Sequence, residues 1–515
     1  MEKLHNNIIL EDDFNKEWAD PENVPYLKNP PKVINVNVGR QLFVDDFLIE
    51  KTSLTPEYHK AKKYQDNPVF KPETPWETDT NSMACPFSGG VWYDEDEEIF
   101  KMWYGASWHK NLAYAISKDG INWERPNLGI VGDTNIILPY EDYNPDFIYD
   151  RGAKYLRPDS TSVWIDYNAP KEERYKLFLR NPGAKHNGII GTSSDGINFE
   201  NLKMTGIVQD RTTIFYNPFR NKWVASVRWL VDYYNRVRYY YETHDFSNGM
   251  NWTEEQITPW LRVDEKDLQP TNVVYNGPHH IPQIYNIDCI AYESIMLGMF
   301  EIFYGPENGD CEKVGLPKIT ELIPMYSRDG YHFSRPSREP FIRADKDNES
   351  SWERGYVQSV TGGVIDCGDH IRIYYTAFKG NEKKLENNWT TNGMYDNGAT
   401  GFATLRKDGF VSLNGNGELL TRILTFNGKK DMYVNIDGEI IAEIITEEGK
   451  VIAKSNKFIG DSVKAKLEFN GFDISSLNDK IFRIKFTVNG KFYSFGFADE
   501  KGDFNGYHGA GKYCK

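Results

Sequence analysis

The sequence predicts an all-β protein, a five-bladed β-propeller followed by a C-terminal β-sandwich. Three observations lead to this prediction: a recurring hairpin motif, a pair of strand-like segments ahead of each copy, and a change of pattern after the last copy. The hairpin is clearest in 112–126, Leu-Ala-Tyr-Ala-Ile-Ser-Lys-Asp-Gly-Ile-Asn-Trp-Glu-Arg-Pro. Its Asp-Gly pair favours a tight turn, because such turns need residues with positive φ.

The hairpin motif occurs five times along the chain. Copies at 191–199 and 325–333 are well kept, 245–252 is degraded, and 404–410 ends the series. The turn glycines are Gly120, Gly196, Gly249, Gly330 and Gly409. A further strand pair precedes each copy, as in 89–106. Each repeat therefore supplies four strands, and radial repetition of four-stranded sheets is the architecture of a propeller.

The flanks of the repeats complete the predicted domain organisation. Residues 1–60 are polar and proline-punctuated, and we expect an N-terminal strap that lies on the propeller or closes its last blade. The propeller is assigned to 61–412 and the sandwich to 413–515. In the last part, short alternating strands are separated by turn residues, as a sandwich requires. Val488-Asn489-Gly490-Lys491 is a strong hairpin signal there.

Composition limits the partners that the chain can take. The net charge of −15 argues against nucleic acid, whose phosphates are bound by basic surfaces. No apolar run approaches about 20 residues and 1–19 lacks the features of a signal peptide, so we expect a cytoplasmic protein with no membrane partner. We expect a neutral, polyhydroxylated ligand, and a homo-oligomer is left open.

The cysteines give no sign of a disulfide framework or a zinc site. They are odd in number, scattered, and free of Cys-x-x-Cys spacing. The five are Cys85, Cys289, Cys311, Cys367 and Cys514. We expect neither a cofactor nor a metal.

Together, the five-bladed layout, the Lys-Met-Trp-Tyr-Gly strand at 101–105, the Asp-Gly hairpin and the C-terminal sandwich resemble one glycoside hydrolase superfamily. It contains β-fructofuranosidases, arabinofuranosidases and xylosidases, together with the mannoside phosphorylases. The layout is most similar to the fructosidase branch and covers most of 60–500. The resemblance implies three carboxylates at the funnel end of the propeller axis, each on the inner part of a different blade. It does not specify the substrate.

Two of these carboxylates are assigned from the resemblance. Glu293, in Ala-Tyr-Glu-Ser, resembles the Glu-Cys motif that carries the acid catalyst in fructosidases, and burial on an apolar strand would raise its pKa as that role requires. Asp210 resembles the aspartate of an Arg-Asp-Pro segment that holds sugar hydroxyls, although here the order of the charged pair is reversed. The alternatives are a glutamate paired with an arginine at a strand edge, and a loop ion pair between Asp210 and Arg211.

The third carboxylate has no clear counterpart. Fructosidases carry Asn-Asp-Pro-Asn-Gly before the first strand of blade one, where this chain has Cys85-Pro86-Phe87-Ser88. The nearest upstream acids are Asp79 and Glu77, and we choose Asp79 as the catalytic candidate. Both could instead be solvated loop acids. The departure leaves an inverting mechanism open, in which a carboxylate activates water.

Polar residues that flank inner strands are the candidates for substrate binding. They are Trp76, Glu77, Arg151, Arg228, His279, His280, Arg354 and Gln358. Adjacent side chains on an extended chain point to opposite faces, so the two histidines are not assigned as a metal site. The strand aromatics are assigned to the blade cores: Trp92, Trp103, Tyr104, Trp164 and Trp223.

The sequence therefore predicts a glycosidase with a carboxylate pair or triad at the propeller axis. A glycoside phosphorylase is one alternative, and would need Arg, Lys or His beside the acid to hold phosphate. Arg211, Arg228, His279 and His280 could supply that cluster. A non-catalytic carbohydrate-binding propeller is the other alternative, and would keep aromatics while losing the paired acids.

Overall fold

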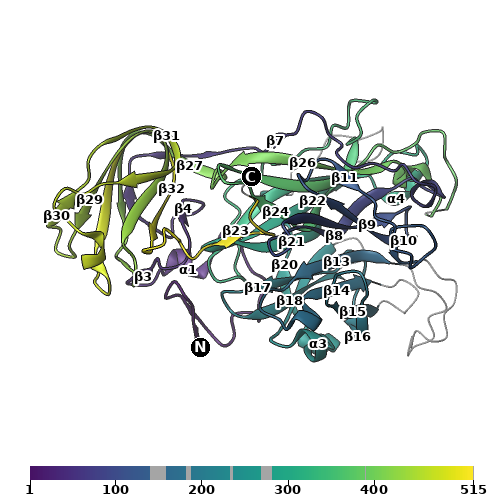
Figure 1. Ribbon diagram of the computed structural model, residues 1–515, viewed down its shortest axis with the longest axis horizontal. Helices are drawn as coiled ribbons and strands as arrows, with labels where there is room; N and C mark the ends of the chain where they lie inside the picture. Colours follow the sequence, from purple (N-terminus) through teal and green to yellow (C-terminus); the bar gives the residue numbers. More distant parts are fainter. Residues whose placement is uncertain (140–157, 181–186, 232–235, 268–280, 389, 514–515) are drawn as a thin grey trace.

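The computed structural model describes residues 1–139, 158–180, 187–231, 236–267, 281–388 and 390–513. Arg151, His279, His280 and Cys514 lie outside these residues. Figure 1 shows two bodies side by side, a ring of sheets and a curled sheet made mainly of the C-terminal part of the chain. Helices in the described part are single turns of four or five residues, and none is long and apolar enough to cross a membrane.

Within the described residues, the ring is built of five blades, of which blades 1 and 5 are joined in one nine-stranded sheet (Figure 1). Blade 1 comprises β8 (Ala84–Asp94), β9 (Ile99–Ala106), β10 (Asn111–Ser117) and β11 (Trp123–Glu124). Blade 2 comprises β13 (Asp159–Ile165), β14 (Tyr175–Arg180), β15 (Asn187–Ser193) and β16 (Glu200–Ile207). Blade 3 comprises β17 (Thr213–Asn217), β18 (Lys222–Leu230), β19 (Arg236–Thr243) and β20 (Thr258–Leu261). Blade 4 comprises β21 (Gln283–Glu293), β22 (Ile295–Gly305) and β23 (Ile319–Ser327). Blade 5 comprises β24 (Gly355–Asp366), β25 (His370–Phe378) and β26 (Gly398–Arg406), with β7 (Lys62–Lys63) as its fourth strand.

The first strand of each blade lies innermost. These strands contact one another in chain order, and β24 returns to β8 through a parallel bridge between Gly362 and Val91. The ring is therefore closed, which confirms the predicted five-bladed propeller. The predicted core aromatics are all buried, and two of them tie blades together: the Trp92 indole donates to the Val163 carbonyl and the Trp164 indole to the Ile214 carbonyl.

The Asp-Gly turns of the recurring hairpins follow the third strand of a blade, and in blades 1 and 2 they join it to the fourth strand. In the first copy the Asp119 carboxylate accepts hydrogen bonds from the backbone N–H groups of Ile121 and Asn122, both at 2.8 Å. Asp195 and Asp329 form the same turn. The degraded copy forms a helical turn, α3 (Phe246–Gly249), capped by Asp245. The last copy leads out of the propeller, so β7 from the N-terminal segment supplies the missing strand.

The second body is an eight-stranded sheet around a separate apolar core. Its C-terminal strands are β27 (Val411–Thr421), β29 (Asp431–Ile445), β30 (Val451–Lys454), β31 (Phe458–Leu467) and β32 (Arg483–Ala498). Three strands from the N-terminal segment join them: β4 (Gln41–Leu42), β5 (Ile49–Thr52) and β6 (Thr55–Tyr58). The later part of the N-terminal segment thus joins this sheet, whereas its first residues lie on the propeller, where the Ala19 backbone N–H donates to the Trp260 carbonyl at 2.8 Å and Glu2 pairs with Arg220 at 2.9 Å.

The predicted hairpin at Asn489-Gly490 is wrong, because β32 runs through it without a turn. Gly490 stands opposite Gly438 of β29, and a Cβ atom on Gly490 would meet the Asp437 carbonyl oxygen at 2.2 Å. These glycines let two long strands approach closely at a bend, which is the other common role of glycine inside a strand.

Candidate functional site

The inner strands begin at one end of the propeller axis, called here the funnel end. Four of the five blades place residues with positive φ there, a rare conformation for residues other than glycine that is often found at functional sites. They are Phe87, Ser88, Ser160, Arg211 and Tyr356. The Arg211 guanidinium joins them, since it donates to the Phe87 carbonyl at 3.0 Å and to the Ser88 hydroxyl at 2.7 Å. Its backbone N–H donates to the Ser160 hydroxyl at 3.1 Å.

Two aspartates from neighbouring blades share one arginine at the funnel end. Asp159 is the first residue of β13, and Asp210 lies just ahead of β17. Nη1 of Arg180 lies 2.6 Å from Oδ2 of Asp159 and 3.7 Å from Oδ1 of Asp210. These two carboxylate oxygens are therefore at most 6.3 Å apart, the sum of the two distances. Asp159 is buried, whereas the Asp210 side chain is 40% exposed.

The charges around Asp210 keep it ionised. Burial in the funnel raises the pKa of its carboxyl group, but the cations Arg180, Arg228 and Lys318 outweigh burial and hold the pKa well below its usual range. An ionised carboxylate of this kind can act as a nucleophile, as a base or as a partner for developing positive charge. It cannot act as a general acid near neutral pH.

Aromatic rings form the wall of the funnel end. Trp108 stacks on Tyr395 with ring centroids 4.2 Å apart, and Phe87 packs edge-on between Trp108 and Tyr356. The hydroxyl groups of Tyr285 and Tyr356 are 2.7 Å apart. A small hollow of about 20 Å³, lined by residues that include Trp108 and Asp159, lies beside this wall. That volume is enough for one water molecule.

Below the funnel end, two buried acids lie on the axis. Asp288 of β21 accepts hydrogen bonds from the hydroxyl groups of Ser359 and Thr361. Glu301 of β22 is fully buried, with Nη2 of Arg211 3.9 Å away. Burial raises the pKa of Asp288 and raises the pKa of Glu301 to about 8, because neither charge is fully compensated in this dry setting.

The raised pKa of Glu301 predicts a pH dependence of stability. The folded protein keeps the Glu301 proton at pH values where an unfolded glutamate, with a pKa of 4.5, has lost it. The free energy of unfolding should therefore fall by on the order of a few kcal/mol as pH rises from about 4.5 to about 8. Glu301→Gln should flatten this slope in urea titrations at several pH values. The exposed Glu339→Gln should leave it as in the wild type, and an unchanged slope in Glu301→Gln would contradict the prediction.

The structure contradicts the expectation that Glu293 joins the other carboxylates. Glu293 is the last residue of β21, not its first, and Thr213 at the start of β17 bonds to Ile287 in the middle of β21. At about 3.3 Å per residue, Glu293 lies about 20 Å beyond that contact, away from Asp210. Its carboxylate accepts hydrogen bonds from the backbone N–H of Arg40 at 3.0 Å and from the Arg40 guanidinium at 2.8 Å. The alternative, a glutamate paired with an arginine at the strand edge, is what the structure contains.

The upstream candidates lie at the edge of blade 1. The Asp79 side chain is 61% exposed and 3.7 Å from the Lys110 ammonium group. Glu77 is fully buried, and its two oxygens accept from the Tyr104 hydroxyl, the Arg125 guanidinium and two backbone N–H groups. The expectation that Glu77 binds substrate is thus wrong, since its oxygens are taken up by the capping box of α2 (Pro75–Thr78). The Trp76 indole donates to Asn135 at 2.9 Å.

Of the remaining candidates, Arg228 lies near Asp210, Arg354 directly precedes β24, and Gln358 lies within β24. Arg354 is buried and 3.6 Å from Glu382. Gln358 is fully buried, and neither atom of its amide has a hydrogen-bond partner among the described residues. The sequence analysis missed Asp159, Arg180 and Lys318. Asp159 carried a usable signal, because it is an acid placed directly ahead of an apolar inner strand.

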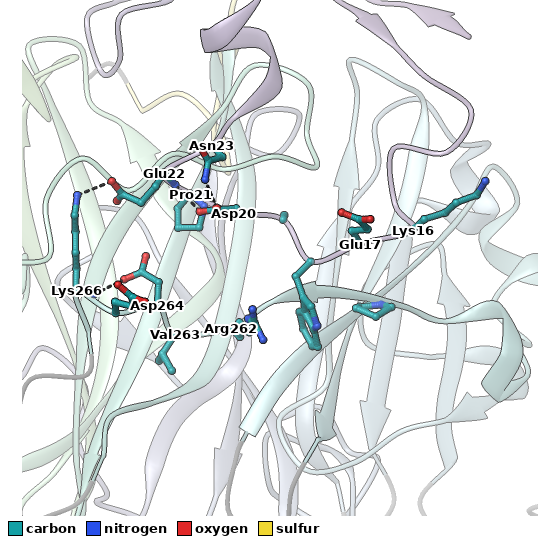
Figure 2. A pocket seen from close by; sticks show the side chains of 14 residues that line it. Lys16, Glu17, Asp20, Pro21, Glu22, Asn23, Arg262, Val263, Asp264 and Lys266 are labelled. Carbon is teal, nitrogen blue, oxygen red and sulfur yellow. Dashed lines mark hydrogen bonds and ion pairs between the residues drawn. The ribbon is translucent and has the colours of Figure 1, made fainter.

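A hollow of about 980 Å³ lies away from the funnel end, between residues 16–23 and 259–266, on the rim beside the outermost strand of blade 3 (Figure 2). The Lys266–Glu22 ion pair spans it. No set of three or more His, Cys, Asp or Glu side chains arranged to hold a metal occurs in the part of the chain that the structure describes.

No protein-family model matches the chain, and no curated protein matches it by sequence. Solved structures that are similar include an N-acetylgalactosamine deacetylase from F. plautii in complex with blood group B trisaccharide. It is 12% identical with a TM-score of 0.41, over 69% of this chain and 95% of that one.

Two further solved structures carry names from the superfamily that the sequence resembles. One is a structure from family 130, a family of mannoside phosphorylases that also contains glycoside hydrolases of β-1,2-mannosidic linkages. It is 13% identical with a TM-score of 0.40, over 69% of this chain and 97% of that one. A Bombyx mori family 32 β-fructofuranosidase is 11% identical with a TM-score of 0.36, over 86% and 93%. At these values the reaction and substrate of the present protein stay open.

Proposed function

We propose that the protein cleaves glycosidic bonds at the funnel end, with Asp210 and Asp159 as its working carboxylates. The observation that carries the proposal is the pair itself: two aspartates from adjacent blades, joined by Arg180, with Asp210 ionised and open to the funnel. Glycosidic cleavage commonly uses two carboxyl groups that flank the scissile bond, and their separation selects retention or inversion.

The roles of the two aspartates follow from their surroundings. Asp210 is ionised and is suited to stabilise positive charge that develops on the sugar ring or to act on the anomeric carbon. Asp159 lies at the small hollow that has room for one water molecule, with Nε2 of His109 3.8 Å from its Oδ1. We assign to Asp159 the activation or orientation of that water, with His109 as its neighbour.

Hydrolysis is the reaction that we favour, and phosphorolysis is kept as the second candidate. The specific observation in favour of phosphorolysis is the surplus of cations beside Asp210, since phosphate is held in proteins by such groups. A carbohydrate-binding propeller without activity would not need an ionised carboxylate among cations at its axis.

A screen of aryl glycosides and oligosaccharides, with and without inorganic phosphate, tests the proposal. We expect turnover of at least one substrate class without phosphate, giving a reducing sugar. Turnover that depends on phosphate and yields a sugar 1-phosphate would replace hydrolysis by phosphorolysis. Binding of sugars without turnover of any substrate would indicate a non-catalytic carbohydrate-binding propeller and would overturn the proposal.

A further inference from the structure

Four cations from neighbouring blades surround the open carboxylate of Asp210. They are Arg180 at the end of β14, Arg228 of β18, Arg236 at the start of β19, and Lys318 just ahead of β23. Two of them have carboxylate partners: Arg180 pairs with Asp159 at 2.6 Å, and Arg236 pairs with Glu307 at 3.3 Å. The remaining two decide what else the site can hold.

Arg228 is a half-buried cation with no carboxylate within ion-pair distance among the described residues. Among the described residues its guanidinium donates one hydrogen bond, 3.1 Å long, to the neutral amide oxygen of Gln209. Burial lowers the pKa of Arg228, the charge of Asp210 raises it, and the like charges of Arg236 and Arg180 lower it. Within the described part of the chain, most donors of this guanidinium have no hydrogen-bond partner. Its planar fork matches the oxygens of a carboxylate or phosphate group.

Lys318 is a buried cation that has no carboxylate contact among the described residues. Its side chain is 2% exposed, and its ammonium group donates to the neutral Tyr285 hydroxyl at 3.1 Å. The same ammonium lies 4.8 Å from the centre of the Tyr356 ring and 5.0 Å from that of Tyr285. Ring faces compensate a desolvated ammonium only in part, so its field reaches into the funnel, where it acts on Asp210.

These charges do not balance within the described residues. Asp159 and Glu307 match Arg180 and Arg236, which leaves Arg228 and Lys318 facing the single carboxylate of Asp210. A partly buried site with one uncompensated positive charge and an available guanidinium fork is stabilised by a further anion. A neutral sugar would leave this charge uncompensated.

We propose that the funnel binds an oxyanion next to Asp210, in contact with Arg228 and in the field of Lys318. The oxyanion is a carboxylate, sulfate or phosphate group, so the ligand is an acidic sugar or a sugar together with free phosphate. This inference rests on the proposed function for the sugar part of the ligand, and it corrects the neutral ligand expected from composition.

Isothermal titration of the intact protein with matched probes tests the proposal without requiring turnover. The pairs are glucuronate against glucose, galacturonate against galactose, and glucose 6-phosphate against glucose, with inorganic phosphate and sulfate alone. We expect at least one anionic probe to bind about tenfold or more tightly than its neutral partner. That advantage should shrink as salt is raised from about 0.05 to 0.3 M, although a partly buried site is screened less than an exposed one.

Two variants and a control locate the effect. Arg228→Gln should weaken binding of the preferred anion about tenfold and leave neutral sugars within about twofold, because it removes the contacting charge. Lys318→Met, whose side chain has a similar length but no charge, should also weaken binding of the preferred anion. Arg262→Gln removes an exposed arginine beside Trp18 on the rim and should change nothing. Thermal melts of all three confirm that they fold.

The outcomes separate the two sources of the anion and the two proposals. Inorganic phosphate that binds alone and more tightly than either uronate identifies free phosphate as the ligand, and a uronate that binds more tightly than inorganic phosphate identifies an acidic sugar. Equal affinity for anionic and neutral probes, absence of binding by every probe, or an anion preference that survives Arg228→Gln would overturn the inference. Anion binding without turnover of any glycoside would overturn only the proposed function. Turnover of neutral glycosides with no preference for anionic probes would overturn only this inference.

Discussion

Asp210→Asn is expected to lower kcat by about three orders of magnitude on the best substrate of the screen, with the protein still folded. Asparagine keeps the shape of the side chain but lacks the negative charge of the Asp210 carboxylate, which Arg180, Arg228 and Lys318 keep ionised. The Arg180–Asp159 contact at 2.6 Å does not involve the substituted group, so the scaffold of the site remains. Steady-state kinetics give kcat and KM, and a melting curve checks folding.

Asp79→Asn is the matched control for this experiment. It makes the same chemical change at the exposed acid that the sequence favoured, whose contact is Lys110 at 3.7 Å. We expect its kcat to stay within about twofold of the wild type, as for most exposed substitutions. A larger loss in Asp79→Asn than in Asp210→Asn would return the catalytic assignment to Asp79.

Glu293→Gln is expected to lower the free energy of unfolding by about 3 kcal/mol while leaving kcat of the folded protein unchanged. Nη2 of Arg40 lies 2.8 Å from Glu293 and 2.9 Å from Asp408, and all three side chains are at most 5% exposed. Removing one carboxylate leaves the buried guanidinium short of negative charge. Urea denaturation measures the loss.

The control is Glu339→Gln, whose carboxylate is 68% exposed and pairs with Arg343 at 2.7 Å. Exposed pairs of this kind contribute little, so its unfolding free energy should stay within about 1 kcal/mol of the wild type. A Glu293→Gln protein of normal stability with a strongly reduced kcat would place Glu293 in the active site and contradict the geometry.

The hairpins show why the fold could be predicted. Ser117, Asp119 and Gly120 close their turn through bonds within six residues, so the signal is local and survives in each good copy. The degraded copy lacks glycine directly after Asp245 and forms a helical turn instead. At Asn489-Gly490 the same local signal fails, because a strand opposite imposes continuation.

The candidate site was harder to predict because it depends on the direction of each strand. Glu293 and Asp159 are both acids at the end of a buried strand, but inner strands begin at the funnel, so the first residue faces it and the last does not. The sequence placed the start of β21 too late and so assigned Glu293 to the wrong end. Lys318 lies 108 residues beyond Asp210, and only the closed ring brings their charges together.

The interlocking of the two bodies has a consequence for how the chain can be made and cut. Residues before 60 build part of the C-terminal sheet, β7 completes blade 5, and β33 (Tyr507–His508) pairs with the end of β21. During translation these paired strands emerge from the ribosome hundreds of residues apart. The contact of β33 with β21 can therefore form only after the C-terminal sheet has been synthesised. Excision of 61–412 as a separate gene product would leave β33 and Arg40 behind, together with the partners of Glu293. We therefore expect the two bodies to fold as one unit, and a protease cut between them not to release a working propeller.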